Sequence, residues 1–298
     1  MAISVTRLHP TFVGEVSGVD LADSRADAQF PEMQAAMDAE RVLVFHGTPM
    51  EQERQVAWAR QFGTLEGEGK HVGILSTGIQ PRTHVQLADI SNLDEKNQVL
   101  GPGDRRRMFA LGNQLWHVDS SFKRVPAKYS ALHAHAVTPE GGETEFADMI
   151  AAYAGLPAGM KEKIDGLVAE HSIFHSRGKL GFEDFSEEER ASLPPVHRPL
   201  VRVHPPSGRK ALYLASHASH ILGMEVPDGR MLIRELLEHA TQREYVHTHR
   251  WAVGDTVIWD NRATLHRGRP YDDTVHKRDM RRATIEDDDP AMAHKAVA

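Results

Sequence analysis

The residues best suited to chemistry are His117 and Asp119, which lie in the stretch LGNQLWHVDSSF over residues 111–122. The alternation of Leu115, His117 and Asp119 suits the end of a β-strand. On a strand, residues i and i+2 point to the same side, so this imidazole and this carboxylate can converge on one point. The pair predicts two ligands of a metal site, although an isolated H-x-D pattern is common by chance.

A third ligand is expected from His266, which lies 147 residues after Asp119 (266 − 119). It follows an apolar run and a polar turn in the segment WAVGDTVIWDNRATLHRGR. Two histidines and one carboxylate form the facial triad of non-haem Fe(II) oxygenases, which leaves further coordination positions open. Arg278 follows His266 after twelve residues (278 − 266). This ordered set is far more specific than any of its parts.

Short strands are the elements expected to position these residues. They are predicted over residues 3–5, 13–19, 41–45, 129–137, 200–203, 212–215 and 256–259. On the strand 129–137, His133 and His135 also have the spacing of metal ligands. No carboxylate is interleaved with them, so we expect them to face solvent or a packed surface.

Helices are predicted between these strands, over residues 31–40, 48–62, 157–171 and 227–243. The last is the strongest, with an apolar stripe formed by Met231, Leu232, Leu236, Leu237 and Ala240. Residues 172–196 are polar and are expected to form a loop. Residues 63–110 lack sustained periodicity, and a loop region of this length is often functional. We interpret it as a lid or entry segment, with a surface insertion as the alternative.

The composition is that of a soluble globular protein, with 40% hydrophobic and 26% charged residues among 298. A net charge of −7 gives no electrostatic indication of a nucleic-acid partner. No apolar run approaches the roughly 18–20 residues that span a bilayer, and the first residues lack a signal-peptide core. Cysteine is absent. We therefore expect a cytoplasmic protein with a single catalytic domain over residues 1–298 and a frayed tail after about residue 286.

The chain resembles the taurine dioxygenase family of Fe(II)/2-oxoglutarate-dependent dioxygenases. The resemblance includes LHPTFVGEVSGVDL, RVLVFHGTPM, QFGTLEG, NQLWHVDSSF and GGETEFADM in the first half. It continues through PLVRVHPPSGRKALYL, ASHASHILGM, ELLEHATQREYVHTHRW and WDNRATLHRGRPYD to RRAT. Within the family, the chain is most similar to the branch that hydroxylates the ether carbon of aryloxyacetates such as 2,4-dichlorophenoxyacetate, giving a phenol, glyoxylate, succinate and carbon dioxide.

The resemblance implies a mainly β fold with flanking helices, namely a double-stranded β-helix or jelly roll. It also implies that His117, Asp119 and His266 bind Fe(II), and that 2-oxoglutarate and dioxygen are co-substrates. Arg278 would anchor the distal carboxylate of 2-oxoglutarate, because a guanidinium is a planar two-pronged donor. Lys277 could take that role if the register differs by one residue. Thr144 matches the family threonine that shares this contact.

The resemblance also suggests contacts to an anionic aromatic substrate. Arg282 matches the arginine that binds the substrate's anionic group, and in an extended segment it shares a side with Arg278. Its neighbour Arg281 should face away as a surface charge. Trp259 matches a pocket tryptophan, with an ordinary core position as the alternative. The weaker candidates for substrate contacts are Asn113, Lys70, His217 and His220.

Other functions remain open from the residues alone. A taurine-type sulfonate or another aromatic carboxylate could be the substrate of the same core. A zinc hydrolase could use the same three ligands with a metal-activated water, and would not need Arg278. A non-catalytic jelly-roll binding protein is the third alternative. The family also implies a homo-oligomer.

Overall fold

A seven-stranded sheet forms the centre of the molecule, and the computed structural model describes residues 2–67, 81–290 and 292. The strand order is β1 (Ser4–His9), β2 (Val13–Ser17), β3 (Val42–Phe45), β13 (Thr256–Asp260), β5 (Ala127–Ala136), β15 (Asp279–Glu286) and β4 (Leu87–Asp89). Both faces of its central strands are covered, so β3 reads as a continuous apolar run, VLVF, and is buried throughout.

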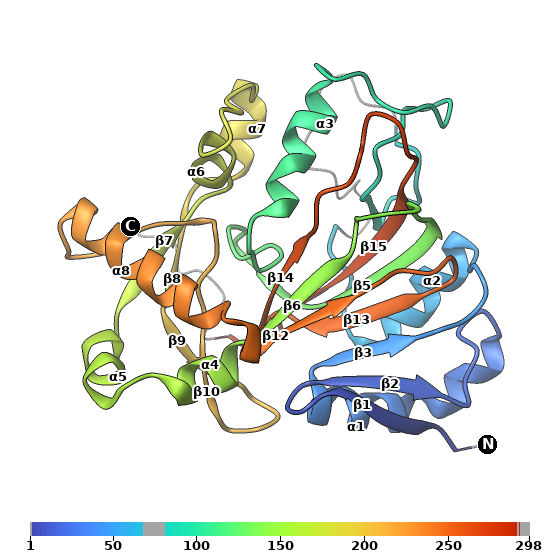
Figure 1. Cartoon of the computed structure of the whole chain (residues 1–298), viewed down its shortest axis with the longest axis horizontal. Coiled ribbons are helices and arrows are strands. Elements are labelled where there is room, and N and C mark those ends of the chain that lie inside the picture. The colour runs from blue at the N-terminus through green and yellow to red at the C-terminus, as the bar shows by residue number, and fades with distance from the viewer. Residues whose placement is uncertain (1, 68–80, 291, 293–298) are drawn as a thin grey trace.

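A smaller sheet packs against one face of the large one (Figure 1). Its strands follow the order β12 (Val246–His249), β6 (Thr144–Asp148) and β14 (Thr264–Gly268). Phe146 on β6 meets Trp259 on β13 with their ring centroids 5.4 Å apart. Both rings belong to an apolar cluster that includes Val257 and Met280. This packing of two facing sheets agrees with the expected jelly roll.

Two helices cover the other face of the large sheet, namely α1 (Phe30–Glu40) and α2 (Gln52–Ala59). Proline in its first turn suits the start of α1, and Arg41 ends it in the left-handed region at a φ of 68°. The helix expected over residues 48–62 starts four residues late, because residues 48–51 are extended and lead into α2. The 3₁₀ turn η2 (Arg60–Phe62) completes it.

Residues 149–245 form a helical layer at one end of the sandwich, seen on the left in Figure 1. Its helices are α4 (Met149–Gly155), α5 (Ala158–Ile164), α6 (Ile173–Gly178), α7 (Glu187–Ser192) and α8 (Val226–Ala240). Its strands are β7 (Val168–His171), β8 (Val196–Pro199), β9 (Val201–Val203), β10 (Lys210–Leu212) and β11 (Ala218–Ile221). On α8 the apolar stripe is largely as expected, but Met231 is 69% exposed.

Two expectations for this layer are wrong. The helix expected over residues 157–171 ends at Ile164, because Gly166 takes a φ of 73° and the chain then forms β7. This strand pairs with both β8 and β11, and such distant partners are invisible to local periodicity. The loop expected over residues 172–196 contains α6 and α7, each of which starts at a serine cap, Ser172 or Ser186.

The chain after β15 stays attached to the body of the protein. Asp287 is buried and lies 2.9 Å from Arg202 in an ion pair. Met292 is buried in the apolar cluster of the helical layer. The expected fraying after about residue 286 is therefore wrong for residues 287–290 and 292, while residues 291 and 293–298 lie outside the described part. No helix in the described part of the chain is long and apolar enough to cross a membrane.

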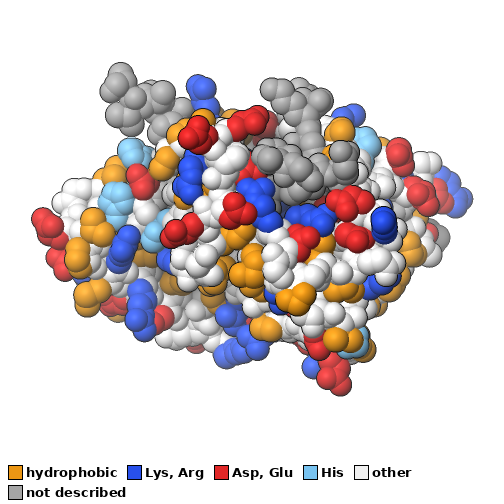
Figure 2. Space-filling model, turned by 90° about the horizontal axis from the view of Figure 1, so that it is seen from above, with side chains coloured by type: hydrophobic (Ala, Val, Ile, Leu, Met, Phe, Trp, Pro, Cys, Tyr) orange, Lys and Arg blue, Asp and Glu red, His pale blue; other side chains and the backbone are white. Residues whose placement is uncertain are grey.

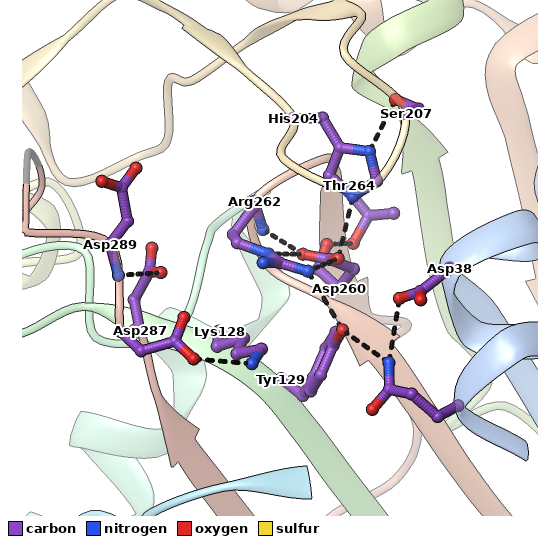
Figure 3. A network of polar contacts seen from close by, with 12 residues as sticks. Asp38, Lys128, Tyr129, His204, Ser207, Asp260, Arg262, Thr264, Asp287 and Asp289 are labelled. Atoms are coloured by element: carbon purple, nitrogen blue, oxygen red, sulfur yellow. Dashed lines mark hydrogen bonds and ion pairs between the residues drawn. The ribbon is translucent and has the colours of Figure 1, made fainter. Parts of the chain in front are cut away.

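A buried polar network stabilises the end of β13 (Figure 3). The Asp260 carboxylate accepts hydrogen bonds from Arg262 Nη2 at 2.6 Å and His204 Nε2 at 3.0 Å. Arg262 Nη2 also donates to the Tyr129 hydroxyl at 3.0 Å. Burial alone would raise the pKa of Asp260, but Arg262 and His204 lower it well below its usual range. The carboxylate is therefore charged and holds two buried partners.

Replacing Asp260 with Ala should lower the free energy of unfolding by about 3–5 kcal/mol, because it leaves the buried guanidinium of Arg262 without its carboxylate partner. Urea denaturation of both proteins measures this difference. Because the folded pKa of Asp260 is depressed, its contribution is present above the unfolded pKa and is lost as pH falls. The difference between the two proteins should therefore shrink below about pH 4. Asp165→Ala, which removes an exposed partner of Lys210, should leave the denaturation midpoint unchanged.

Candidate metal centre and substrate pocket

The structure brings His117, Asp119 and His266 together on the inner side of the sandwich. Candidate ligand atoms from the three residues all lie within 4.8 Å of one another. His117 and His266 form an isolated antiparallel bridge, in which each backbone N–H donates to the other's carbonyl at 2.9–3.0 Å. The regular strand end expected at His117 is thus a single bridge to β14. That bridge places two residues that are distant in the chain side by side.

The hydrogen bonds of these side chains leave their ligand atoms pointing at one another. His117 Nδ1 lies 2.7 Å from the Leu115 carbonyl and must donate to it, so Nε2 keeps its lone pair. His117 Nε2 and His266 Nε2 lie 3.9 Å and 3.5 Å from the two Asp119 oxygens. Ser130 Oγ donates to Asp119 Oδ2 at 2.7 Å. Ser130 thereby orients the Asp119 carboxylate, as outer-shell groups do for the ligands of metal sites.

The protonation states suit a divalent cation. Burial lowers the pKa of His117 to about 4 and that of His266 well below its usual value, so both imidazoles are neutral. Burial alone would raise the pKa of Asp119, but Arg282 and the two imidazoles lower it to about 2. Two neutral imidazoles and one ionised carboxylate are a donor set that Fe(II) accepts.

Trp259 lies both in the core and at the wall of the pocket. Its ring is buried in the core, lines the pocket and packs on the His266 ring with centroids 4.6 Å apart. Its indole N–H donates to Asn261 Oδ1 at 3.2 Å, and the Asp119 backbone N–H donates to the same oxygen at 3.1 Å. Asn261 therefore connects β13 to the loop that carries Asp119, the candidate carboxylate ligand.

A pocket of about 270 Å³ opens over the three candidate ligands. Arg278 lines it and is buried, and its backbone N–H donates to Asn92 Oδ1 at 2.8 Å. Lys277 is exposed instead and donates to the Asn97 carbonyl at 2.6 Å. Of these two neighbours, Arg278 lines the pocket and Lys277 does not. Thr144 lines the same pocket and accepts a hydrogen bond from Trp251 Nε1 at 2.9 Å.

Arg282 on β15 and Arg278, which immediately precedes this strand, both line the pocket. In the structure its guanidinium pairs with the Asp119 carboxylate. Arg281 points to the opposite face, as expected, but it is largely buried beside Asp279 rather than a surface charge. The guanidinium of Arg282 is thus placed next to the candidate metal ligands.

The weaker candidates for substrate contacts do not all lie at the pocket. Asn113 and His217 line the pocket, and His217 Nδ1 lies 2.9 Å from Ser176 Oγ. His220 is not among the pocket residues and instead lies 2.9 Å from Ser219 Oγ. Lys70 lies outside the described residues. His133 is a packing residue, since it accepts from the Met50 N–H at 2.9 Å on the helix-covered face.

The sequence interpretation missed Arg177, a buried pocket residue on α6. Burial lowers its pKa to about 10, and the charge of Arg282 acts in the same direction. The pattern that could have located it is the Ser172 cap followed by Ile173 and Phe174, which indicates a short helix facing inward. Ser130 and Asn261, which position Asp119, were missed because only the fold brings them to it.

Basic and acidic side chains are interspersed on the face seen from above in Figure 2. The short helix α3 (Arg105–Ala110) carries several ion pairs, since Arg105 pairs with Asp184 and Glu189 and Arg106 pairs with Glu95. The Arg105–Glu189 pair links α3 to α7.

Comparison with known proteins identifies the chemistry. Residues 4–284 match the model of the family described as taurine catabolism dioxygenase TauD, TfdA family. The chain is 47% identical over 290 residues to the alpha-ketoglutarate-dependent 2,4-dichlorophenoxyacetate dioxygenase of Cupriavidus pinatubonensis, covering 97% of this chain and 99% of the relative. It is 36% identical over 304 residues to an (S)-phenoxypropionate/alpha-ketoglutarate-dioxygenase of Sphingobium herbicidovorans, covering 98% and 99%.

A solved structure supports the same conclusion. The crystal structure of AAD-2 in complex with Mn(II) and N-oxalylglycine has a TM-score of 0.90 and 47% sequence identity, covering 96% of this chain and 98% of that one. The expected jelly-roll fold, enzyme class and co-substrates are confirmed. The zinc hydrolase and the non-catalytic binding protein, which the residues alone left open, are thereby set aside.

Proposed function

The chain belongs to the taurine catabolism dioxygenase TauD, TfdA family, and from this premise we propose that it hydroxylates the ether carbon of an aryloxyacetate such as 2,4-dichlorophenoxyacetate. It is an Fe(II)/2-oxoglutarate-dependent dioxygenase. When bound, iron and 2-oxoglutarate supply the oxidising chemistry, in which dioxygen gives succinate, carbon dioxide and one oxygen atom inserted into the substrate. The hydroxylated ether carbon is a hemiacetal, which collapses to a phenol and glyoxylate.

The protein's part in this reaction is to hold and orient the reactants. His117, Asp119 and His266 would bind Fe(II), with Ser130 holding the carboxylate. Arg278, assisted by Thr144, would bind the distal carboxylate of 2-oxoglutarate. A guanidinium remains charged in a buried site and matches a carboxylate with two N–H groups.

The observation that carries the substrate class is the composition of the pocket. Its wall combines the ligand triad and Arg282 with apolar side chains, including Phe109, Phe122, Leu132 and Ile173. An aryloxyacetate has the same division, with an apolar ring at one end and a carboxylate next to the carbon to be oxidised. Arg282, beside Asp119, is proposed to bind that carboxylate; Asn113 and His217 are proposed to contact the remainder of the substrate.

Aerobic incubation with Fe(II), 2-oxoglutarate and 2,4-dichlorophenoxyacetate should release succinate and 2,4-dichlorophenol in equal amounts. Equal yields are expected because each oxidised 2-oxoglutarate accounts for one hydroxylated ether carbon. Succinate with little phenol would reject the aryloxyacetate and point to another substrate of the same core, such as a taurine-type sulfonate or a different aromatic carboxylate. Omitting Fe(II) or 2-oxoglutarate provides the control.

The organisation of the chain is part of the same proposal. We propose one catalytic domain over residues 1–298, with residues 63–110 contributing a cover to the pocket. The described portion supports this, since residues between Ala88 and Ala110 supply part of the pocket wall. We also propose that the enzyme is cytoplasmic and homo-oligomeric, as the resemblance implies.

A further inference from the structure

We propose that Arg177 binds the carboxylate of the aryloxyacetate, so that two arginines, Arg177 and Arg282, hold the substrate's anionic end. This inference rests on the proposed function and names a residue that determines substrate specificity. It starts from the charges in the pocket.

Six arginines line the pocket, and four of them already have an acidic partner. The paired ones are Arg106 with Asp104, Arg107 with Asp273, Arg269 with Glu145 and Arg282 with Asp119. Arg177 and Arg278 have no carboxylate within 4.0 Å in the described parts of the chain. The reaction brings two carboxylate-bearing molecules to this pocket. Arg278 is assigned to 2-oxoglutarate, which leaves Arg177 for the other.

The surroundings of Arg177 do not resemble those of a structural arginine. It is only 4% exposed, and its hydrogen bonds to Ser176 Oγ and Asn113 Oδ1 are both 3.4 Å long. Those distances exceed the usual range of about 2.7–3.2 Å. Arg198, which is equally buried, instead donates to four backbone carbonyls of Ser121, Lys123, Arg124 and Met292. A buried charge is costly unless it is paired, so Arg177 is poised for an anion.

The guanidinium of Arg177 is held in a fixed place. Its Cζ lies 4.3 Å from the centre of the Phe109 ring on α3. It also packs against Gly112 so closely that a Cβ there would lie 2.1 Å from Cζ and Nη1. These contacts cover the flat surface of the Arg177 guanidinium. The N–H groups along its edge remain available for hydrogen bonding.

This place is close to the candidate metal centre. The neighbouring Ser176 contacts His217, whose ring centroid lies 6.1 Å from that of the ligand His117. The carbon to be oxidised is bonded directly to the substrate carboxylate. The cation that binds this carboxylate must therefore lie beside the metal ligands, as Arg177 and Arg282 both do. Because Arg282 is already paired with Asp119, Arg177 contributes the cation that has no carboxylate within 4.0 Å among the described residues.

The test compares 2,4-dichlorophenoxyacetate with its neutral amide, using wild type, Arg177→Gln and Gly112→Ala. Calorimetric titration of the anaerobic protein loaded with Mn(II) and 2-oxoglutarate gives each Kd, and steady-state assays with Fe(II) give each KM. Arg177→Gln should raise both constants for the acid roughly 10- to 100-fold, the range for losing hydrogen bonds to a charged group. The Kd for the amide and the KM for the co-substrate should change less than about threefold.

Gly112→Ala retains the charge but displaces the guanidinium, so it should also weaken binding of the acid more than that of the amide. If Arg177→Gln does not fold, Gly112→Ala provides the same comparison of acid with amide. The matched control is Gly178→Ala, next to Arg177, where a Cβ meets nothing within 4 Å. This control should behave like the wild type.

Two results would overturn the role of Arg177. One is an unchanged affinity for the acid in Arg177→Gln. The other is an equal loss for the acid, the amide and 2-oxoglutarate together with a lower Tm, which would make Arg177 a structural support for α3. A wild type that binds 2-oxoglutarate but oxidises no aryloxyacetate would instead reject the proposed function itself. An active wild type with an unaffected Arg177→Gln variant rejects only this inference.

Discussion

Replacing His117 or Asp119 with Ala should abolish succinate formation from 2-oxoglutarate. Each change removes one of three groups whose donor atoms lie within 4.8 Å of one another. Altering only the outer-shell partner of a metal ligand typically costs about 10- to 100-fold in metal affinity or activity. Loss of a ligand itself should exceed that range. Asp119→Ala has a further consequence, because it leaves the buried guanidinium of Arg282 without its partner.

Anaerobic calorimetry with Fe(II) measures the metal affinity directly, and succinate yield measures turnover. The matched control is His46→Ala, which removes an imidazole that is about half exposed and interacts with Glu15 and Asp255. It should bind iron like the wild type. Full activity and unchanged iron affinity in His117→Ala or Asp119→Ala would remove those residues from the site. Ser130→Ala should lower the iron affinity or the succinate yield less than loss of a ligand does, by about 10- to 100-fold, the range for an outer-shell partner.

Arg278→Ala should weaken the apparent affinity for 2-oxoglutarate, raising its KM roughly 10- to 100-fold, the range expected for hydrogen bonds to a charged group. The same change should affect the KM for the aryloxyacetate much less. Arg278 is the only pocket cation apart from Arg177 that lacks an acidic partner in the described chain, so 2-oxoglutarate would supply its counter-ion. Arg282→Ala should produce the reverse pattern, because its guanidinium lies beside Asp119 and not near Arg278's contacts at Asn92 and Gly142.

Initial rates with each substrate varied in turn separate the two effects. Lys277→Ala is the matched control, since the Lys277 side chain is exposed and bonds the Asn97 carbonyl. It should leave both KM values unchanged. If Arg278→Ala weakens the aryloxyacetate and Arg282→Ala weakens 2-oxoglutarate, the two assignments are interchanged. If Lys277→Ala has the effect expected of Arg278→Ala, the neighbouring lysine is the anchor.

The structure also places the two conspicuous histidines of β5 outside the group formed by His117, Asp119 and His266. His133 and His135 have the same i, i+2 spacing as His117 and Asp119. His133, however, faces the helix-covered side of the large sheet, where it contacts Thr256 Oγ1 at 2.8 Å and the Met50 N–H. Spacing puts two side chains on one side of a strand, but the packing of the sheet decides whether that side is a core or a pocket.

The chemistry of the site was predictable from the sequence because it depends on residue types. An H-x-D pair, a distant His and a following Arg are what a facial triad and a carboxylate anchor require, whatever the intervening chain does. Several of the short strands, such as β3, β5 and β13, were predictable for a similar reason, since alternation and apolar runs reflect local burial. The resemblance added the jelly roll and the co-substrates, which periodicity alone does not indicate.

What only the tertiary structure decided depends on contacts between distant segments. Residues 168–171 form a strand and not the end of a helix, because β8 and β11 pair with them. Asn92, which lies far away in the chain, bonds the backbone of Arg278, and Arg278 lines the pocket while Lys277 is exposed. Arg177 on α6 lines the pocket, where its guanidinium stacks on the Phe109 ring of α3. Local sequence sets which groups are available, whereas burial and charge pairing arise between segments that meet only in the folded chain.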